Sequence, residues 1–384
     1  MNYTKKQLMQ IYTESESSRM KVAFVCPRFY PHIGGVETVV FQLASHISKQ
    51  GLDVTVLTQS HNAKLPKKEH LDNFTVRRFH ELGIGNDIKI SLPLLQYLQI
   101  CSGQYDLVHA HNYHAFPSLA AALTKKGRPL IFSPHYHGGG HTSIADLLHV
   151  PYRLIGKFIF SQSDTILCDT DAEAQLVRKD FPQYGPKIHL ISLGINVEAI
   201  KYAKRSKSVH PYVVTIGRLE NYKNVELIIK SMQFIDQKVH LQVVGNGPSM
   251  EHLKILTSRL NLTKRIFFLG NLPEDRLFQL LKTAKVYINL SSKEAYNLSL
   301  AEAAVAEVGI VVSDISTHRE LAKRFGINPI SFVQTGSSPQ MVAHYVMVAM
   351  GSPSKTKILP PSWDTVAKHT IQIYATALKS HAVT

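Results

Sequence analysis

The 384-residue sequence contains only three cysteines, Cys26, Cys101 and Cys168. An odd, sparse set in apolar surroundings argues against a disulfide scaffold and a cysteine-based zinc site, and it favours a reducing compartment. Long hydrophobic runs are absent too, since no segment approaches the ~18 apolar residues of a membrane span. The first twenty residues also lack the apolar core of a secretory leader. We therefore expect a cytoplasmic protein, peripheral on the cytoplasmic membrane face at most.

The sequence also has little acidic charge. It carries 43 lysines and arginines against 28 aspartates and glutamates, which gives a formal net charge of +15. The excess is spread over both halves, because residues 1–205 contribute 23 − 16 = +7 and the remainder contributes 20 − 12 = +8. Such a spread suits a polyanionic ligand or an anionic membrane surface. Nucleic acid is not an expected partner, since no helix-turn-helix, zinc-finger or RNP-type motif is present.

Short apolar runs alternate with helical patterns, which predicts parallel βαβ units. The predicted strands of the first half are 21–26, 52–59, 105–111, 129–135, 165–170 and 187–195. A basic stretch at 201–210, which we interpret as a linker, interrupts the pattern. The predicted strands after it are 212–219, 239–247, 265–270, 285–291 and 310–314.

This order predicts an α/β protein with two Rossmann-like, doubly wound parallel-sheet domains facing across a cleft. The expected domains are residues 1–203 and 204–360. A final helix within 361–384, with Trp363 on its apolar side, is expected to pack back towards the first domain.

Ligands of such sheets bind beyond the carboxyl ends of the strands. Gly34 and Gly35 follow the first strand, where glycine lets the backbone approach a phosphate and exposes helix N–H groups. Gly217, Arg218 and Lys223 follow the first strand of the second half, where two cations can hold a diphosphate. The alternatives are an ordinary tight turn at the glycines and solvated surface cations.

The motif GNGPSM at 245–250, which includes Gly245, imitates a dinucleotide fingerprint but lacks its third glycine. A dehydrogenase is therefore not favoured. In SSKEAYNLSLAEAAVAE (291–307), Glu294 lies in a predicted loop and Glu302 in the following helix. Both carboxylates can then reach one ligand and accept hydrogen bonds from sugar hydroxyls. Alternatively, Ser299-x-x-Glu302 is a capping box, which makes Glu302 a structural cap.

Histidines cluster in the first half. His135 ends a predicted strand, so we expect it to point into the cleft. HYHGGGH at 135–141 suggests zinc, but a glycine run without helical spacing or cysteine is a poor ligand set. Asp169-Thr170-Asp171 resembles the DxD metal signature, although aspartate at a strand-to-helix junction is more often an N-cap.

Taken in order, these motifs resemble the family 4 glycosyltransferases, which have the GT-B fold. The resemblance runs from about Lys21 to Tyr374, and the Trp363 helix looks like the cross-over helix of that family. It is carried by the Glu294–Glu302 spacing and by GGVE (34–37), HAHN (109–112), GRLENYKN (217–224) and VVGNGP (243–248).

The resemblance implies a retaining glycosyltransferase of hexosyltransferase type that needs no metal or other cofactor. Its donor would be a nucleotide-diphosphate sugar, and its acceptor a glycan or a lipid-linked molecule. Arg218 and Lys223 would hold the diphosphate and Glu302 the ribose, while Glu294 and His135 would act at the donor sugar and the reacting carbon. The remaining implied donor-site residues are Gly34, Gly35, Gly217, Gly245, Asn297 and Leu298.

Three stretches depart from the family pattern, and they bear on the phosphate-contacting backbone and on donor choice. They are Glu307-Val308-Gly309, Tyr296-Asn297 and the junction 193–196. Three alternatives remain: a sugar-nucleotide epimerase or hydrolase, a non-catalytic sugar-nucleotide-binding protein, and a zinc hydrolase built on the histidines. Residues 150–162 mix cations with apolar side chains, which fits either an ordinary buried helix or a helix lying on an anionic bilayer.

Overall fold

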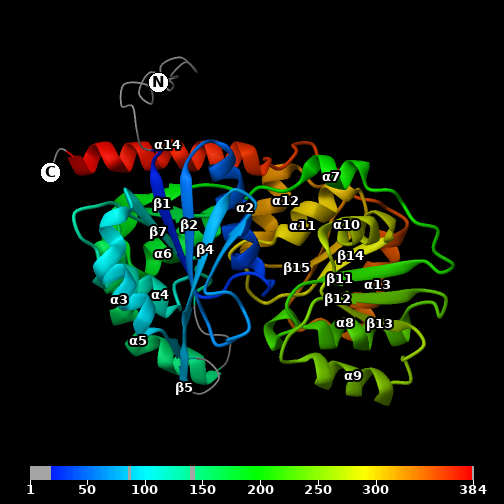
Figure 1. The fold of residues 1–384 in the computed structure, drawn as a ribbon. Helices are drawn as coiled ribbons and strands as arrows, with labels where there is room; N and C mark the ends of the chain where they lie inside the picture. The colour runs from blue at the N-terminus through cyan, green and yellow to red at the C-terminus, as the bar shows by residue number, and fades with distance from the viewer. Residues whose placement is uncertain (1–18, 85–87, 139–142, 383–384) are drawn as a thin grey trace.

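The computed structural model describes residues 19–84, 88–138 and 143–382, and it contains two large sheets, one from each half of the chain (Figure 1). The first sheet has the strand order β10-β9-β8-β7-β1-β2-β4-β3, parallel except for β3 against β4. Its strands are β1 (Lys21–Cys26), β2 (Asp53–Ser60), β3 (Lys68–Leu71), β4 (Phe74–His80), β7 (Leu107–His111), β8 (Leu130–Ser133), β9 (Thr165–Cys168) and β10 (Ile188–Leu190). A separate hairpin joins β5 (Leu82–Ile84) and β6 (Ile88–Ile90).

The second sheet is wholly parallel, with the order β13-β12-β11-β14-β15-β16. Its strands are β11 (Tyr212–Ile216), β12 (His240–Val244), β13 (Ile266–Gly270), β14 (Val286–Asn289), β15 (Gly309–Ser313) and β16 (Ser331–Val333). In each sheet the strand order reverses at one point, between β1 and β7 and between β11 and β14. Ligands of open α/β sheets bind beyond the strand ends at such switch points.

Helices cover both faces of the first sheet, which explains its nearly continuous apolar strands. Val22 and Phe24 of β1 pack on one face with α2 and α14, whereas Ala23 and Val25 pack on the other with α3, α4 and α5. The helices of this half are α2 (Gly35–Lys49), α3 (Leu92–Cys101), α4 (Phe116–Leu123), α5 (Ser143–Gln162), α6 (Asp171–Asp180) and α7 (Val197–Tyr202). Those of the second half are α8 (Val225–Ser231), α9 (Met250–Arg259), α10 (Glu274–Thr283), α11 (Leu298–Ala306), α12 (Ser316–Phe325) and α13 (Pro339–Met350). None of the helices in the described residues combines the length and apolarity needed to cross a bilayer.

The last helix, α14 (Trp363–Ala382), is red in Figure 1 and returns from the second half to run along the first. It contacts α2, and His46 Nδ1 lies 2.7 Å from Asp364 Oδ1. Trp363 sits directly on the chain at Gly194, where a Cβ atom would lie 2.7 Å from the Trp363 nitrogen. Only glycine allows this close approach, so residue 194 fixes where α14 starts.

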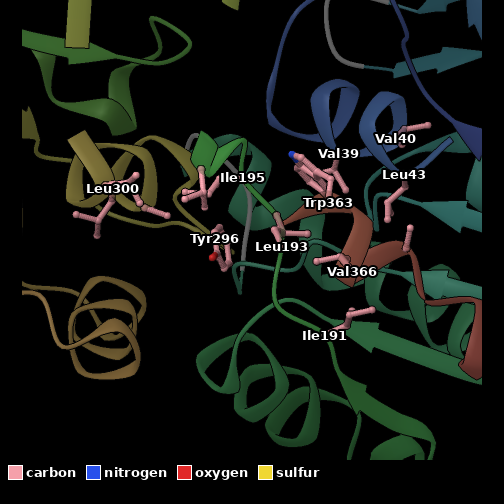
Figure 2. Close-up of a cluster of buried hydrophobic side chains, with 14 of the residues drawn as sticks. Val39, Val40, Leu43, Ile191, Leu193, Ile195, Tyr296, Leu300, Trp363 and Val366 are labelled. Carbon is pink, nitrogen blue, oxygen red and sulfur yellow. The ribbon is translucent and has the colours of Figure 1, made fainter. Parts of the chain in front are cut away.

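The predicted strand at 187–195 is too long, because β10 ends at Leu190. Ile191, Leu193 and Ile195 still alternate inward, but they leave the sheet and join a cluster that spans both halves of the chain (Figure 2). In that cluster they meet Trp363 of α14 and Leu300 of α11. Strands β3, β4, β5, β6 and β16 are not among the predicted strands, because their patterns are polar or their apolar runs are short.

Candidate active site

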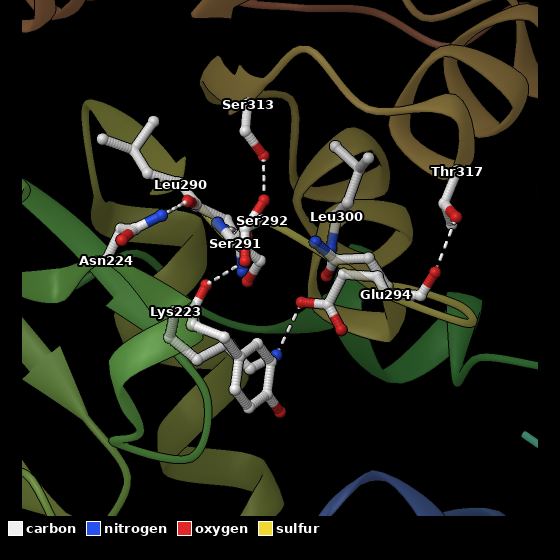
Figure 3. Close-up of polar contacts among 12 residues, drawn as sticks. Lys223, Asn224, Leu290, Ser291, Ser292, Glu294, Leu300, Ser313 and Thr317 are labelled. Carbon is white, nitrogen blue, oxygen red and sulfur yellow. Dashed lines mark hydrogen bonds and ion pairs between the residues drawn. The ribbon is translucent and has the colours of Figure 1, made fainter. Parts of the chain in front are cut away.

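Lys223 and Glu294 form the central ion pair of the second half (Figure 3). Lys223 ends a short turn after β11 and Glu294 lies in the loop after β14, on the two sides of the switch point. Lys223 Nζ lies 2.5 Å from Glu294 Oε1, and the two side chains are 14% and 11% exposed. Burial alone would lower the pKa of Lys223, but the charge and hydrogen bond of Glu294 raise it overall. The ammonium group therefore stays charged although it is largely removed from water.

Hydrogen bonds to backbone carbonyl groups hold the loops of this ion pair together. Asn224 Nδ2 donates to Leu290 O at 2.8 Å, and Ser292 N donates to Tyr222 O at 2.8 Å. Thr317 of α12 donates through Oγ1 to Glu294 O at 2.7 Å (Figure 3). The loop after β14 is thus attached to the β11 loop on one side and to α12 on the other.

Glycine is required where the turns after β11 and β12 touch. Gly217 and Gly245 have φ values of +151° and +118°, and a Cβ on Gly245 would lie 2.0 Å from Gly217 O. This contact brings Gly217 and the adjacent Arg218 to the same strand end as Lys223. Arg218 is partly exposed, and its Nε lies 2.8 Å from Glu220 Oε1. Both cations predicted to hold a diphosphate therefore follow β11, one exposed and one buried.

Asn297 caps α11 with its own side chain. Its Oδ1 accepts from Leu300 N at 3.0 Å, and its Nδ2 lies 2.9 Å from His318 Nε2. Asn297 is 5% exposed, and its side-chain oxygen and nitrogen already have hydrogen-bond partners. A ligand at this helix end would therefore meet backbone N–H groups, starting with that of Leu298.

The capping-box alternative for Glu302 is wrong, since the N-cap of α11 is Asn297 and not Ser299. The structure gives the Glu302 carboxyl no hydrogen-bond partner among the described residues. Burial, with a smaller contribution from the charge of Glu274, raises the pKa of Glu302 to about 7. This carboxyl is thus left unpartnered one helical turn above the α11 N-terminus.

In the first half, α2 begins at Gly35 with Gly34 as its N-cap. A Cβ on Gly34 would lie 2.5 Å from Glu37 Oε2, whereas one on Gly35 would have no atom within 4 Å. Arg28 Nε lies 3.5 Å from Glu37 Oε1. Gly35 thus faces open space, as an approach by a ligand needs, while Gly34 accommodates the acid of its own helix.

His135 lies beyond the end of β8, with a left-handed φ of +47°. Its Nδ1 is 2.9 Å from Asp169 Oδ2 and its Nε2 is 3.2 Å from His111 Nδ1. The Asp169 carboxylate accepts a hydrogen bond, which assigns the His135 proton to Nδ1 and makes His111 the donor to Nε2. The imidazole is 9% exposed. A ligand that binds Nε2 would therefore replace the hydrogen bond from His111.

His111 and His109 form the base of this arrangement on β7. Burial lowers the pKa of both, to about 3 for His109, so both are neutral at pH 7. His109 lies 2.7 Å from the Tyr374 hydroxyl of α14 and 2.9 Å from Ser133 Oγ. His111 Nε2 is buried without a hydrogen-bond partner in the described part of the chain. The sequence assigned no role to His111, although its place in HAHN, at the end of a switch-point strand, was a usable signal.

The segment 169–171 is not built as a metal signature. Asp169 orients His135, and the N-cap of α6 is Thr170, whose Oγ1 accepts from Glu173 N at 3.0 Å. The interpretation of these aspartates as N-caps was therefore off by one residue. Across residues 19–84, 88–138 and 143–382, no group of three or more metal-ligating side chains comes together. His141 of the suggested zinc motif lies outside the described residues.

A hydrogen bond joins the loops of the two halves of the site. Thr170 Oγ1, next to Asp169, donates to Ala295 O, next to Glu294, at 3.0 Å. The Asp169–His135 pair and the Lys223–Glu294 pair therefore lie on adjoining loops. A surface pocket of about 820 Å³ lies elsewhere, between α14 and the β9–β10 edge, and none of its lining residues belongs to these pairs.

Comparisons with known proteins give matches over most of the chain. The family model described as Glycosyltransferase Family 4 matches residues 33–199, and that described as Glycosyl transferases group 1 matches residues 196–359. An uncharacterized glycosyltransferase from Methanocaldococcus jannaschii is 24% identical over 397 residues, covering 94% of this chain and 99% of the relative. The D-rhamnosyltransferase WbpZ from Pseudomonas aeruginosa is 23% identical, covering 74% of this chain and 75% of the relative. The structure of Anabaena HepE in complex with UDP-glucose matches with a TM-score of 0.69 at 16% identity, covering 95% and 98% of the two chains.

Proposed function

The chain belongs to glycosyltransferase family 4, and from this premise we propose that it transfers a sugar, with retained configuration, from a nucleotide-diphosphate sugar to a glycan or lipid-linked acceptor. The observation that carries the proposal is the Lys223–Glu294 pair at the switch point of the second sheet. It supplies a cation for a diphosphate and an adjacent carboxylate for sugar hydroxyls. The second half would bind the donor and the first half the acceptor.

The chemistry follows from charge. The leaving group is a nucleotide diphosphate, whose growing negative charge needs preorganised cations aimed at it. Lys223, largely shielded from water and still charged, is such a cation, and Arg218 lies at the same strand end. The departing phosphate takes the proton of the acceptor on the same face of the sugar. No divalent ion and no separate base are then needed.

A thermal-shift screen of nucleoside diphosphates and their sugars identifies the donor, because a ligand that binds the native state raises Tm. UDP-sugars come first, since the HepE structure holds UDP-glucose. Transfer to saccharide and lipid-linked acceptors is then measured. Rapid donor turnover without an acceptor would instead indicate an epimerase or hydrolase, and binding without transfer a non-catalytic binding protein.

Chelation is expected to leave the reaction intact. Because the proposed charge stabilisation comes from side chains, transfer rates in excess EDTA should match untreated enzyme within about twofold, and added Mg²⁺ or Mn²⁺ should not raise them. A rate that falls with EDTA and returns with a divalent ion contradicts the metal-independent mechanism. Stoichiometric zinc in the purified protein, lost together with activity, would support the hydrolase built on histidines.

The acceptor side of the proposal includes contact with an anionic membrane. Within residues 152–162 of α5, Ile159 and Phe160 are buried, whereas Leu154 is 73% exposed. Phe158 is exposed one turn from Leu154, and Arg153 and Lys157 are exposed beside them. Apolar side chains flanked by cations on one helix face suit a negatively charged bilayer. This face would bring the site close to a lipid-linked acceptor.

The double substitution Leu154→Glu, Phe158→Glu is expected to abolish flotation of the protein with phosphatidylglycerol-containing vesicles. The reason is that the two carboxylates remove the apolar contact and repel the anionic surface. Ile255→Glu on α9 is the matched control, because Ile255 is 52% exposed in the other half of the chain. Equal flotation of all three proteins, or no flotation of the unmodified chain, contradicts this part of the proposal.

A further inference from the structure

One carboxylate of the second half caps a helix of the first. Glu320 of α12 accepts from Asp171 N through Oε1 and from Ala172 N through Oε2, both at 2.8 Å. These N–H groups belong to the first turn of α6 and have no partner within that helix. The contact therefore joins the two halves of the chain through a bidentate, charge-assisted pair of hydrogen bonds.

Arg324 reinforces this junction from the next turn of α12. Its Nη2 lies 2.6 Å from Glu320 Oε1 and 3.6 Å from Asp171 Oδ2, and its Nη1 donates to Asp169 O at 3.5 Å. Glu320 is 15% exposed and Arg324 26%, so neither is freely solvated. The paired guanidinium holds the Glu320 carboxylate in the orientation that α6 requires.

The same helix holds the other half of the site. At the start of α12, Thr317 Oγ1 donates to Glu294 O at 2.7 Å. One to two turns later, Glu320 and Arg324 form hydrogen bonds to the segment that begins with Asp169. Asp169 in turn orients His135. A single rigid helix thus contacts the loop of Glu294 and the loop of Asp169, which are far apart in sequence.

We infer that Glu320 is a positioning residue. Its hydrogen bonds to the α6 N-terminus fix the position of the Asp169–His135 pair relative to Glu294. Helix α12 thus links the loop of Glu294 to the loop of Asp169. The inference rests on the proposed function, because it assigns these two pairs to one reaction. Loss of these hydrogen bonds would leave the donor-binding groups of the second half in place. It would shift Asp169 and His135 of the first half. Misplacement by about 1 Å costs on the order of 100-fold in rate.

The experiment compares Glu320→Ala and Glu320→Gln with Lys323→Ala, an exposed position on the same helix. Hydrogen exchange of the amides of Asp171 and Ala172 reports directly on their hydrogen bonds to Glu320. Glu320→Ala is expected to speed their exchange and to lower kcat at least ~10-fold, because the segment that carries Asp169 is then no longer held in place. Glu320→Gln, with one strong acceptor left, should fall between. The Kd for UDP or for the best-binding diphosphate should change less than about twofold, and Lys323→Ala should match the unmodified chain throughout.

Unchanged exchange in Glu320→Ala would overturn the inference, and so would faster exchange with an unchanged kcat. A parallel loss of kcat and diphosphate affinity would show a general structural defect instead, which also overturns it. If the unmodified chain transfers no sugar, the proposed function fails by itself. The exchange data and the diphosphate affinity then decide whether Glu320 joins the two halves.

Discussion

Replacing Lys223 with alanine is expected to lower kcat/KM for transfer by at least about 100-fold, the loss that follows removal of one preorganised oxyanion donor. The structure places this ammonium group 2.5 Å from Glu294, 14% exposed and with a raised pKa. A charge held in such a place acts on the leaving diphosphate with little screening by water. A 100-fold loss corresponds to about 2.7 kcal/mol of transition-state stabilisation. Single-turnover and steady-state kinetics measure it.

The matched control is Lys230→Ala. Lys230 is also paired with a glutamate, Glu226, at 2.6 Å, but it is 41% exposed on α8. Exposed pairs contribute little, so activity and stability should be nearly unchanged. Lys223→Ala also leaves Glu294 unpaired and lowers the free energy of unfolding. The double variant Lys223→Met, Glu294→Gln removes both charges and should recover stability without recovering turnover. Full activity in either Lys223 variant would remove the donor-site assignment.

The sequence could predict the fold because its local signals agree with the final structure. Strand β1 has the predicted bounds, 21–26, because its apolar run is continuous and Pro27 follows it. The segment 187–195 was mispredicted for a physical reason. Its alternating apolar residues are buried against Trp363 and Leu300 rather than in a sheet, and alternation does not report which partner buries a side chain.

The strand-end cations could be located from sequence because the carboxyl ends of parallel strands form the binding edge. The pairing of His135 with His111 and Asp169 could not. It depends on β7, β8 and β9 being neighbours in the sheet, and strand order is a long-range property. Glu320 is a stronger case, since its partners are amides 148 and 149 residues earlier in the chain. No local pattern marks such a contact.

His135→Asn is expected to lower kcat by about 100-fold and to leave the affinity for the nucleoside diphosphate unchanged. Asparagine tolerates the left-handed backbone that His135 adopts at φ +47°, and its amide can still donate to Asp169. The substitution therefore removes the oriented Nε2 atom with little added backbone strain. The resemblance placed His135 near the reacting carbon, where interactions that strengthen in the transition state contribute several kcal/mol.

The control for this variant is His189→Asn, an exposed histidine on the edge strand β10 of the same sheet. Both proteins should keep a Tm close to that of the unmodified chain. The split between kcat and diphosphate affinity is what identifies the role, because Arg218 and Lys223, the cations proposed to hold the diphosphate, both lie in the second half. A fall in diphosphate affinity equal to the fall in kcat would place His135 in donor binding. An unchanged kcat would mean that the Asp169–His135–His111 network has only a structural role at the carboxyl ends of β7, β8 and β9. The sugar contacts would then be assigned to Glu294 alone.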